Sequence, residues 1–250
     1  IFFNAIPNSE KFVYQTAIQV PFKNIREQND CSSSIVAENG YVETNLDVAT
    51  IPLSGWIDTE VFMANKPLSR FRYNQEEVTD IMLLKDKYDI VFCATGLLPD
   101  YLSEIYRNDM FRPVLGDVLI VELEQNWPFT HLEGLFLIPL QNGKYYLGST
   151  YVKNFTSAAP SLDRANGLLE KARLQGVKVS KMISYTSAVR PATFDRSPLV
   201  GNISDNIYSF TGMGSRALLH APLLADQIFN KIEYSGEIFE KMNIKRALKV

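Results

Sequence analysis

The pattern of hydrophobic residues changes near Arg112, and this change constrains the fold more than any other feature of the chain. Before it, residues 88–94 form a nearly continuous apolar run that is followed by Gly96. Such a run predicts a strand that is buried on both faces, as in a parallel sheet. After it come shorter β-rich runs joined by turns, at residues 118–123, 134–139, 144–148 and 179–189. We therefore expect a mostly antiparallel sheet over about residues 110–190.

The segments on either side of this sheet predict helices and further strands. The Asn142-Gly143 pair indicates a hairpin. Residues 162–175 form an amphipathic pattern that ends at Gly176, which is typical of a helix and its C-terminal cap. Residues 206–210 predict a strand that leads into a helix of about 218–231. Further strands and helices are expected nearer the N-terminus: a strand at 11–22, short or irregular strands at 40–54, a helix that opens at Asp58 or Thr59, and a possible short strand at 71–75.

Together these patterns predict an α/β (α+β) fold with two lobes. Residues 85–96 and 206–232 are expected to form an α/β lobe that is distinct from the antiparallel sheet. The chain has 250 residues, of which 46% are hydrophobic and 21% are charged, so it can bury a large core and is not a disordered chain.

Charge and cysteine content exclude several classes of protein. With 25 Lys and Arg against 28 Asp and Glu, the net charge is −3. This balance makes a nucleic-acid partner unexpected, although a chain with a negative net charge can still carry a local basic patch. Two cysteines are too few for a disulfide framework, and no apolar run is long enough to span a membrane. The cytoplasm is therefore the default compartment.

The strongest local motif is Gly212-x-Gly214-x-x-Ala217, which follows the 206–210 strand and opens the last predicted helix. Such a turn lets the backbone approach a phosphate or a ring, and the helix N-terminus offers free N–H groups. As a dinucleotide fingerprint it stands too close to the end of the chain to be followed by a ribose-binding acid. The alternatives are a tight strand-to-helix turn and a cofactor-contacting turn of another kind.

Two other positions are candidates for ligand binding. Arg190 ends a β-rich run, where a guanidinium can hold a carboxylate through two hydrogen bonds. The alternative is that Arg190 forms a structural ion pair with Asp195 or another acid. Thr95 and Gly96 follow the buried strand, and ligands bind at the carboxyl ends of parallel strands. No spacing of Cys, His and acids predicts a metal site, and neither a Gly-x-Ser-x-Gly nor a phosphate-binding loop is found.

Five segments, in this order, resemble the D-amino acid oxidase/glycine oxidase (DAO) superfamily of FAD-dependent oxidoreductases. Residues 89–96 (D-I-V-F-C-A-T-G) resemble its hydrophobic strand that ends in A-T-G. Residues 112–117 (R-P-V-L-G-D) resemble R-P-x-R-G-Q, and residues 138–150 resemble its paired strands "Y-I-x-P … G-x-T". Residues 189–201 resemble G-x-R-P-x-T-x-D-x-x-P-x-I-G, and residues 212–222 resemble its C-terminal flavin segment. The oxidase half of the bifunctional tRNA wobble-uridine modification enzyme is also similar in this last segment.

The resemblance implies a function and a set of site residues. It implies an FAD-dependent enzyme that oxidises a C–N bond of an amino acid or related small-molecule amine by hydride transfer to the flavin. Substrate-binding residues would be Arg190, Phe136 and Tyr151. Cofactor-binding residues would be Thr95, Gly96, Gly212, Met213, Gly214, Ser215, Arg216 and Ala217. A non-catalytic flavoprotein-like binding module and a tRNA-modifying amine oxidase are the alternatives.

The resemblance also implies a division of the chain. Residues 1–75 and 109–190 would form the substrate domain, and residues 76–108 and 191–250 would belong to the FAD domain. Several positions depart from the family pattern: Phe136 replaces a tyrosine, Asp117 replaces a glutamine and Met213 replaces a histidine. The N-terminal Gly-x-Gly-x-x-Gly unit of about 80–90 residues would precede Ile1. Without such a unit, these 250 residues are expected to bind FAD weakly.

Overall fold

The computed structural model describes residues 13–21, 36–37, 40–41, 43–45, 48–57, 59–64, 72, 74–97, 100–127, 131–132 and 134–249. The chain divides into two compact units, which we describe one at a time. The first unit comprises Ile1–Tyr73, Asp117–Thr150 and Ala159–Ser187. The second unit comprises Asn74–Gly116, Tyr151–Ala158 and Ala188–Val250.

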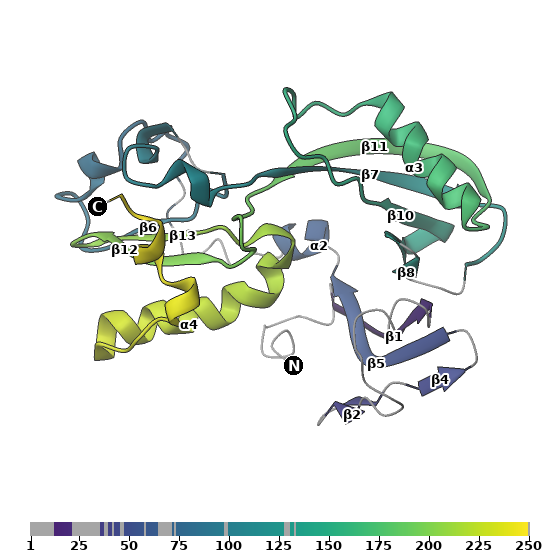
Figure 1. Cartoon of the computed structure of the whole chain (residues 1–250), viewed down its shortest axis with the longest axis horizontal. Helices are drawn as coiled ribbons and strands as arrows, with labels where there is room; N and C mark the ends of the chain where they lie inside the picture. The colour runs from purple at the N-terminus through teal and green to yellow at the C-terminus, as the bar shows by residue number, and fades with distance from the viewer. Residues whose placement is uncertain are drawn as a thin grey trace. The chain divides into compact units, whose positions relative to one another are not determined.

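The first unit is built on a five-stranded sheet with the strand order β11-β7-β10-β9-β8 (Figure 1). The strands are β7 (Val114–Leu123), β8 (His131–Leu132), β9 (Leu135–Pro139), β10 (Lys144–Gly148) and β11 (Val179–Arg190). β10 pairs antiparallel with both β7 and β9, and β8 pairs antiparallel with β9. The prediction of an antiparallel sheet in this part of the chain is confirmed. The Asn142-Gly143 hairpin joins β9 to β10 through one 3-10 turn, η7 (Gln141–Gly143).

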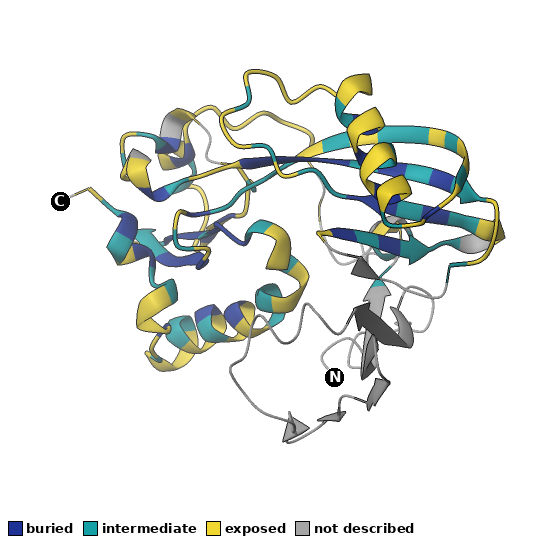
Figure 2. Cartoon of the chain, turned by 45° about the vertical axis from the view of Figure 1, so that its right-hand side comes forward, coloured by how far each residue is buried: buried dark blue, intermediate teal, exposed yellow. Residues whose placement is uncertain are grey.

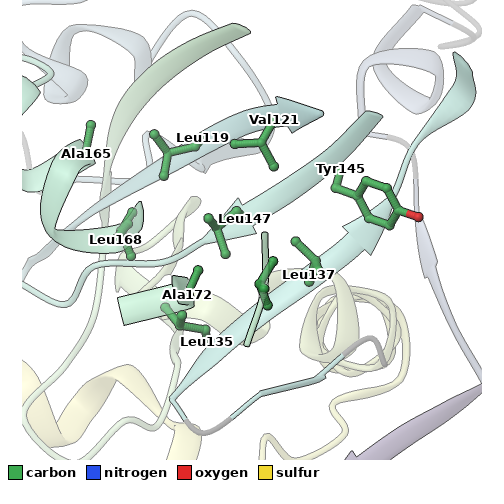
Figure 3. Packing of buried hydrophobic residues seen from close by; sticks show 10 residues of the cluster. Leu119, Val121, Leu135, Leu137, Tyr145, Leu147, Ala165, Leu168 and Ala172 are labelled. Carbon is green, nitrogen blue, oxygen red and sulfur yellow. The ribbon is translucent and has the colours of Figure 1, made fainter. Parts of the chain in front are cut away.

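The core of the first unit lies between this sheet and helix α3 (Leu162–Leu174). Figure 3 shows the side chains of both layers meeting. Every second residue of β7, β9 and β10 is buried here, because side chains of a strand alternate between its two faces. The strand residues are Leu119, Val121, Leu135, Leu137, Tyr145 and Leu147, and α3 adds Ala165, Leu168 and Ala172. The helix begins after Ser161, whose side chain accepts a hydrogen bond from the Arg164 N–H at 3.4 Å.

The N-terminal part of the first unit contains two small sheets and a short helix. β1 (Val13–Pro21) and β4 (Glu43–Asn45) both pair antiparallel with β5 (Val48–Ile57), and β2 (Val36–Ala37) pairs with β3 (Gly40–Tyr41). The strand expected at 11–22 is confirmed, while β5 is a continuous strand of 10 residues, longer than the short strands expected within 40–54. Helix α2 (Thr59–Ala64) starts where predicted. Asp58, as its cap, lies outside the described residues, as do residues 71 and 73. Residues 72, 74 and 75 of the short strand expected at 71–75 are not in a strand.

The second unit combines a three-stranded sheet with one long helix (Figure 1). β13 (Ile207–Thr211) lies in the middle, parallel to β6 (Val91–Cys93) and antiparallel to β12 (Leu199–Ser204). Helix α4 (Ala217–Tyr234) buries Leu224 and Ile228 and leaves its other face exposed (Figure 2). Short 3-10 turns complete the unit: η4 (Ile81–Leu84), η5 (Asp100–Leu102), η6 (Asn108–Met110), η8 (Gly214–Arg216), η9 (Glu240–Met242) and η10 (Ile244–Ala247).

The prediction that the strand at 88–94 is buried on both faces is wrong for the described residues. Only Val91 and Cys93 of β6 are buried, and the Phe92 side chain between them is 54% exposed. β6 pairs with β13 alone, and only one of its faces packs into the core cluster that contains Tyr106. Alternation along the strand therefore turns Phe92 away from that core.

Candidate functional site

The carboxyl ends of β6 and β13 lie at one edge of the second unit's sheet. Cys93 is paired with Ser209 in the parallel register, so the segments that follow them leave the sheet side by side. The Thr211 hydroxyl donates a hydrogen bond of 2.7 Å to the Gly96 carbonyl. The Thr95 hydroxyl donates to the Leu97 carbonyl at 2.9 Å. The two candidate turns that the sequence singled out are thus joined to each other at this edge.

The turn after β13 is fixed by backbone contacts. Gly212 has a φ of +73°, a left-handed conformation that favours glycine. Met213 forms a β-bridge with Ala192, and the Gly214 N–H donates to the Pro191 carbonyl at 3.0 Å. η8 then leads directly into α4. The segment that follows Arg190 therefore lies against the glycine turn, which places both candidate motifs in one site.

A cavity of about 140 Å³ lies between these two segments. It is lined by Val114, Tyr151, Arg190, Ala192, Arg196, Gly212, Met213, Gly214, Ser215 and Arg216. The structure therefore brings together most of the predicted site residues. Thr95 lines a different cavity of the second unit, and Ala217 begins α4. Phe136 belongs to the first unit, where it pairs with Gly148.

Arg190 reaches this cavity across the backbone of Gly116. A Cβ atom at position 116 would overlap the guanidinium of Arg190. Glycine is therefore required at position 116 for Arg190 to adopt this conformation. The glycine of the R-P-V-L-G-D motif thus positions an arginine that lies far from it in the sequence, a role that the motif alone did not indicate.

Asp195 pairs with Arg246, which the sequence did not predict. The Arg246 guanidinium donates a hydrogen bond of 2.8 Å to Asp195, and the Thr193 hydroxyl and Ser197 N–H donate to the same carboxylate at 3.1 and 3.0 Å. Burial raises the pKa of Asp195, but these hydrogen bonds outweigh it and hold the pKa below its ordinary value. Asp195 is therefore a structural anchor of the loop that follows Arg190.

Asp117 is the centre of a buried polar cluster in the first unit. Its side chain is fully buried and pairs with Arg164 of α3 at 2.6 Å. The Thr150 hydroxyl donates to it at 2.6 Å, and the Ser187 hydroxyl donates as well. Burial raises the pKa of Asp117, but the hydrogen bonds from Arg164, Ser187 and Thr150 together hold the pKa below its ordinary value. The departure at position 117 is thus accommodated by a complete set of donors.

The 140 Å³ cavity is suited to bind an anion or the edge of a polar ring. Arg190, Arg196 and Arg216 supply positive charge, and none of the described residues that line it is an Asp or a Glu. The N-terminus of α4, next to Arg216, adds a positive dipole end. Its volume is below the about 300 Å³ needed by a whole drug-sized ligand. The residues present therefore fit one end of a large cofactor together with an anionic group.

Arg196, Val114 and Ala192 line the cavity but were not predicted as site residues. Arg196 immediately follows the R-P-x-T-x-D segment, and its φ of +60° turns the chain at that point. Neither hydropathy nor spacing distinguishes such a residue from any exposed arginine. No group of three or more His, Cys, Asp or Glu side chains that could hold a metal ion occurs in the described part of the chain. Within those same residues, no helix combines the length and apolarity needed to cross a membrane.

We predict that Gly212→Ala lowers the free energy of unfolding by about 2–3 kcal/mol. A Cβ there would lie 2.8 Å from Cγ2 of Thr193, and the backbone is left-handed. Gly143→Ala is the control, because its φ of +71° is equally strained but its Cβ would meet nothing within 4 Å. Chemical denaturation measures both. Equal losses in the two variants would contradict the close approach of Thr193.

Comparison with known proteins connects this geometry to a family. Residues 61–230 match the family model described as FAD dependent oxidoreductase (DAO). The chain is 25% identical over 151 residues to the tRNA 5-methylaminomethyl-2-thiouridine biosynthesis bifunctional protein MnmC of Idiomarina loihiensis. This match covers 57% of the chain and 24% of that relative, so the chain spans about a quarter of the relative's length.

Solved structures share the fold. Glycine oxidase from Bacillus cereus superposes with a TM-score of 0.60 and 19% identity, covering 94% of this chain and 69% of that one. Iminodiacetate oxidase from Chelativorans sp. BNC1 superposes with a TM-score of 0.67 and 11% identity, covering 97% and 79%. At these identities the likeness concerns the fold. The matched segment, residues 61–230, includes Arg190 and the glycine turn.

Proposed function

Because the chain belongs to the DAO family of FAD-dependent oxidoreductases, we propose that it oxidises a C–N bond of an amino acid or a related amine by hydride transfer to the flavin. The observation that carries this proposal is the cavity in which Arg190 and Tyr151 face the turn 212–216. An arginine beside a glycine-rich turn is suited to hold an anionic substrate against a planar cofactor. Glycine oxidase and iminodiacetate oxidase are named for substrates with an amine and a carboxylate, which supports this class.

In this proposal the residues of the chain orient the substrate and balance charge. The flavin, when bound, supplies the hydride-accepting chemistry, so the site needs no side-chain acid–base pair. Arg190 anchors the carboxylate, and Tyr151 lines the same cavity. Met213, Gly214, Ser215 and Arg216 would hold the ring end, with Gly212 turning the backbone toward it and Thr95 and Gly96 at the neighbouring strand end. Helix α4 begins at Ala217, and its N-terminus would stabilise negative charge near the turn 212–216.

In this proposal the two units have different roles. We assign the flavin-ring contacts to the second unit, which contains the 76–108 and 191–250 segments. We assign most of the substrate domain, residues 1–73 and much of 109–190 including Phe136, to the first unit, whereas the substrate-binding Arg190 and Tyr151 lie in the second unit. A tRNA-modifying amine oxidase is the second candidate, because the relative MnmC is named for the biosynthesis of a modified tRNA nucleoside, 5-methylaminomethyl-2-thiouridine.

The test is anaerobic reduction of the flavin-loaded protein, followed in the visible spectrum. A panel of glycine, sarcosine, D-amino acids and proline analogues is offered. Bleaching by a member of the panel supports amine oxidation. A yellow protein that no amine on the panel bleaches would favour the tRNA-linked alternative, and a protein that takes up no flavin would favour a non-catalytic binding module.

We predict that the 250-residue chain binds FAD weakly, and about as weakly as FMN. The adenosine and pyrophosphate need a glycine-rich turn, a helix and then a second strand that ends in a ribose-binding acid. The chain's single Gly-x-Gly pair, at Gly212 and Gly214, is followed in the described residues by α4 and two 3-10 turns, and not by such a strand. The contacts described above would reach only the ring end. Quenching of flavin fluorescence measures both affinities. A strong preference for FAD over FMN would contradict the prediction.

A further inference from the structure

A second and larger cavity of the second unit adjoins the Arg190 cavity. Its volume is about 630 Å³, and it shares Val114, Tyr151, Ala192 and Arg196 with the smaller cavity. This volume falls within the roughly 300–1,000 Å³ of small-molecule sites. We call this cavity the outer groove. Its lining differs in chemistry from the chain as a whole.

The outer groove is cationic although the chain is acidic overall. Arg112, Lys153 and Arg196 line it and are exposed, and none of its described lining residues is an Asp or a Glu. Two acids on neighbouring segments already accept hydrogen bonds from other cations, since Asp109 pairs with Arg107 and Asp195 with Arg246. The net charge of −3 therefore hides a local surface that attracts anions.

The same groove carries three aromatic side chains. Tyr151 and Phe194 are 57% and 59% exposed, and Phe155 is half-buried. The Lys153 ammonium lies 5.9 Å from the centre of the Tyr151 ring, so a cation and an aromatic face occur together. Core packing does not account for rings exposed to this degree. Flat, exposed rings beside cations are the elements that bind unpaired bases and their phosphates.

The outer groove continues into a further cavity of about 370 Å³, which shares Arg112 and Phe194 with it. The other two arginines there are ion-paired, Arg107 with Asp109, which also lines this cavity, and Arg246 with Asp195. A ligand that extends through both would be long, with anionic groups beside the cations of the outer groove and planar rings beside its aromatic side chains. Charge repeated along a chain that also carries planar rings is a property of single-stranded nucleic acid.

We propose that the outer groove binds single-stranded nucleic acid. Arg112, Lys153 and Arg196 would contact phosphates, and Tyr151, Phe155 and Phe194 would stack on bases. Because the groove opens onto the Arg190 cavity, the amine to be oxidised would be borne by a nucleotide. This link to oxidation rests on the proposed function, whereas the binding itself needs no flavin.

The test is the fluorescence anisotropy of a labelled single-stranded RNA of about ten nucleotides, within the range of about 4–16 nucleotides typical of such sites. Over a salt series the logarithm of the binding constant should fall with a slope of about −2, because each of three phosphate contacts contributes about −0.7. The double variant Arg112→Glu/Lys153→Glu should bind the RNA at least tenfold more weakly. The loss of two phosphate contacts should also make the salt slope less negative by about 1.4. Phe194→Ala should bind about 5- to 150-fold more weakly with an unchanged slope.

The matched control is Lys241→Glu/Lys245→Glu, which reverses two exposed cations of the same unit that do not line the outer groove. It should bind RNA as the unmodified protein does. The inference is overturned if no saturable binding occurs at low salt, or if the control loses as much affinity as the groove variant. It is also overturned if polyglutamate competes as well as RNA does and Phe194→Ala has no effect.

Reduction of the flavin by a small amine is measured on the same proteins. Lys241→Glu/Lys245→Glu should leave that rate unchanged, because neither residue lines the outer groove or the Arg190 cavity. If no small amine reduces the flavin but the groove variants still lose RNA, oxidation of a free amino acid or amine fails as the proposed function and the groove assignment stands. If the amine is oxidised and RNA does not bind, only the groove assignment fails.

Discussion

Replacing Asp117 by asparagine is expected to lower the free energy of unfolding by about 3–5 kcal/mol, the cost of breaking a buried ion pair. The carboxylate is fully buried and accepts hydrogen bonds from Arg164, Thr150 and Ser187. The asparagine amide keeps the shape but offers N–H groups to three donors. For a chain of this size the loss corresponds to a fall of about 6–20 °C in Tm.

The control for this prediction lies on the same helix. Glu170 of α3 also pairs with an arginine, Arg173, at 2.7 Å, but both side chains are more than half exposed. An exposed pair of this kind contributes little to stability, so Glu170→Gln should leave the Tm almost unchanged. Differential scanning calorimetry of the two variants compares one buried and one exposed ion pair. Similar Tm values for Asp117→Asn and the unmodified protein would show that the cluster does not hold α3 to the sheet.

The buried carboxylate also predicts the direction of acid unfolding. The pKa of Asp117 is lower in the folded state than the about 3.9 of an unfolded chain, so the unfolded state binds more protons as the pH falls. Its stabilisation is therefore complete above about pH 4 and is lost as the pH falls through the lower folded pKa. In Asp117→Asn, denaturation midpoints between pH 7 and pH 3 should decline less steeply than in the unmodified protein. An identical decline would mean that other carboxylates dominate.

The regular parts of the fold could be predicted because their side chains follow a simple period. Alternate residues of β7, β9 and β10 lie in the core of the first unit, and Asn142-Gly143 joins two of these strands in the expected hairpin. Helix α3 is likewise visible from its apolar spacing and the glycine that follows it. In all of these the local sequence and the tertiary packing favour the same structure.

The contacts that hold the site could not be predicted, because they join residues far apart in the sequence. Asp117 meets Arg164 and Ser187, and Asp195 meets Arg246, yet spacing does not distinguish these acids from solvated ones. The exposure of Phe92 was missed for a related reason. A short apolar run does not reveal how many of its faces are covered, since that depends on which strands and helices pack beside it.

The positive charge of the outer groove could not be predicted from composition either. A net charge of −3 is a sum over the whole chain, whereas Arg112, Lys153 and Arg196 come together only when three separate segments fold. Each segment carries a cation close to an aromatic residue in the sequence, but only the fold brings the three segments together around one groove.

Replacing Arg190 by alanine should raise the KM for an anionic substrate by about 10- to 150-fold, because a charge-assisted pair of hydrogen bonds contributes about 1.5–3 kcal/mol. Arg190 lines the cavity opposite the glycine turn. Arg190→Lys keeps the charge but loses the planar guanidinium, so its KM should lie between that of the unmodified protein and that of Arg190→Ala. Flavin-loaded protein and the best substrate of the amine panel are needed for this measurement.

Gly116 provides a test of Arg190 that leaves Arg190 itself in place. The methyl group of Gly116→Ala would overlap the guanidinium, which is the mobile end of its side chain and can move away more easily than the backbone. We expect a rise in KM close to that of Arg190→Ala, with a Tm near that of the unmodified protein. The KM of the double variant Gly116→Ala/Arg190→Ala should then be no higher than that of Arg190→Ala, because both changes remove the same interaction. Unchanged kinetics in Gly116→Ala and Arg190→Ala would exclude an anchoring role. If Arg190→Ala unfolds while Gly116→Ala folds and binds substrate normally, Arg190 is a structural residue.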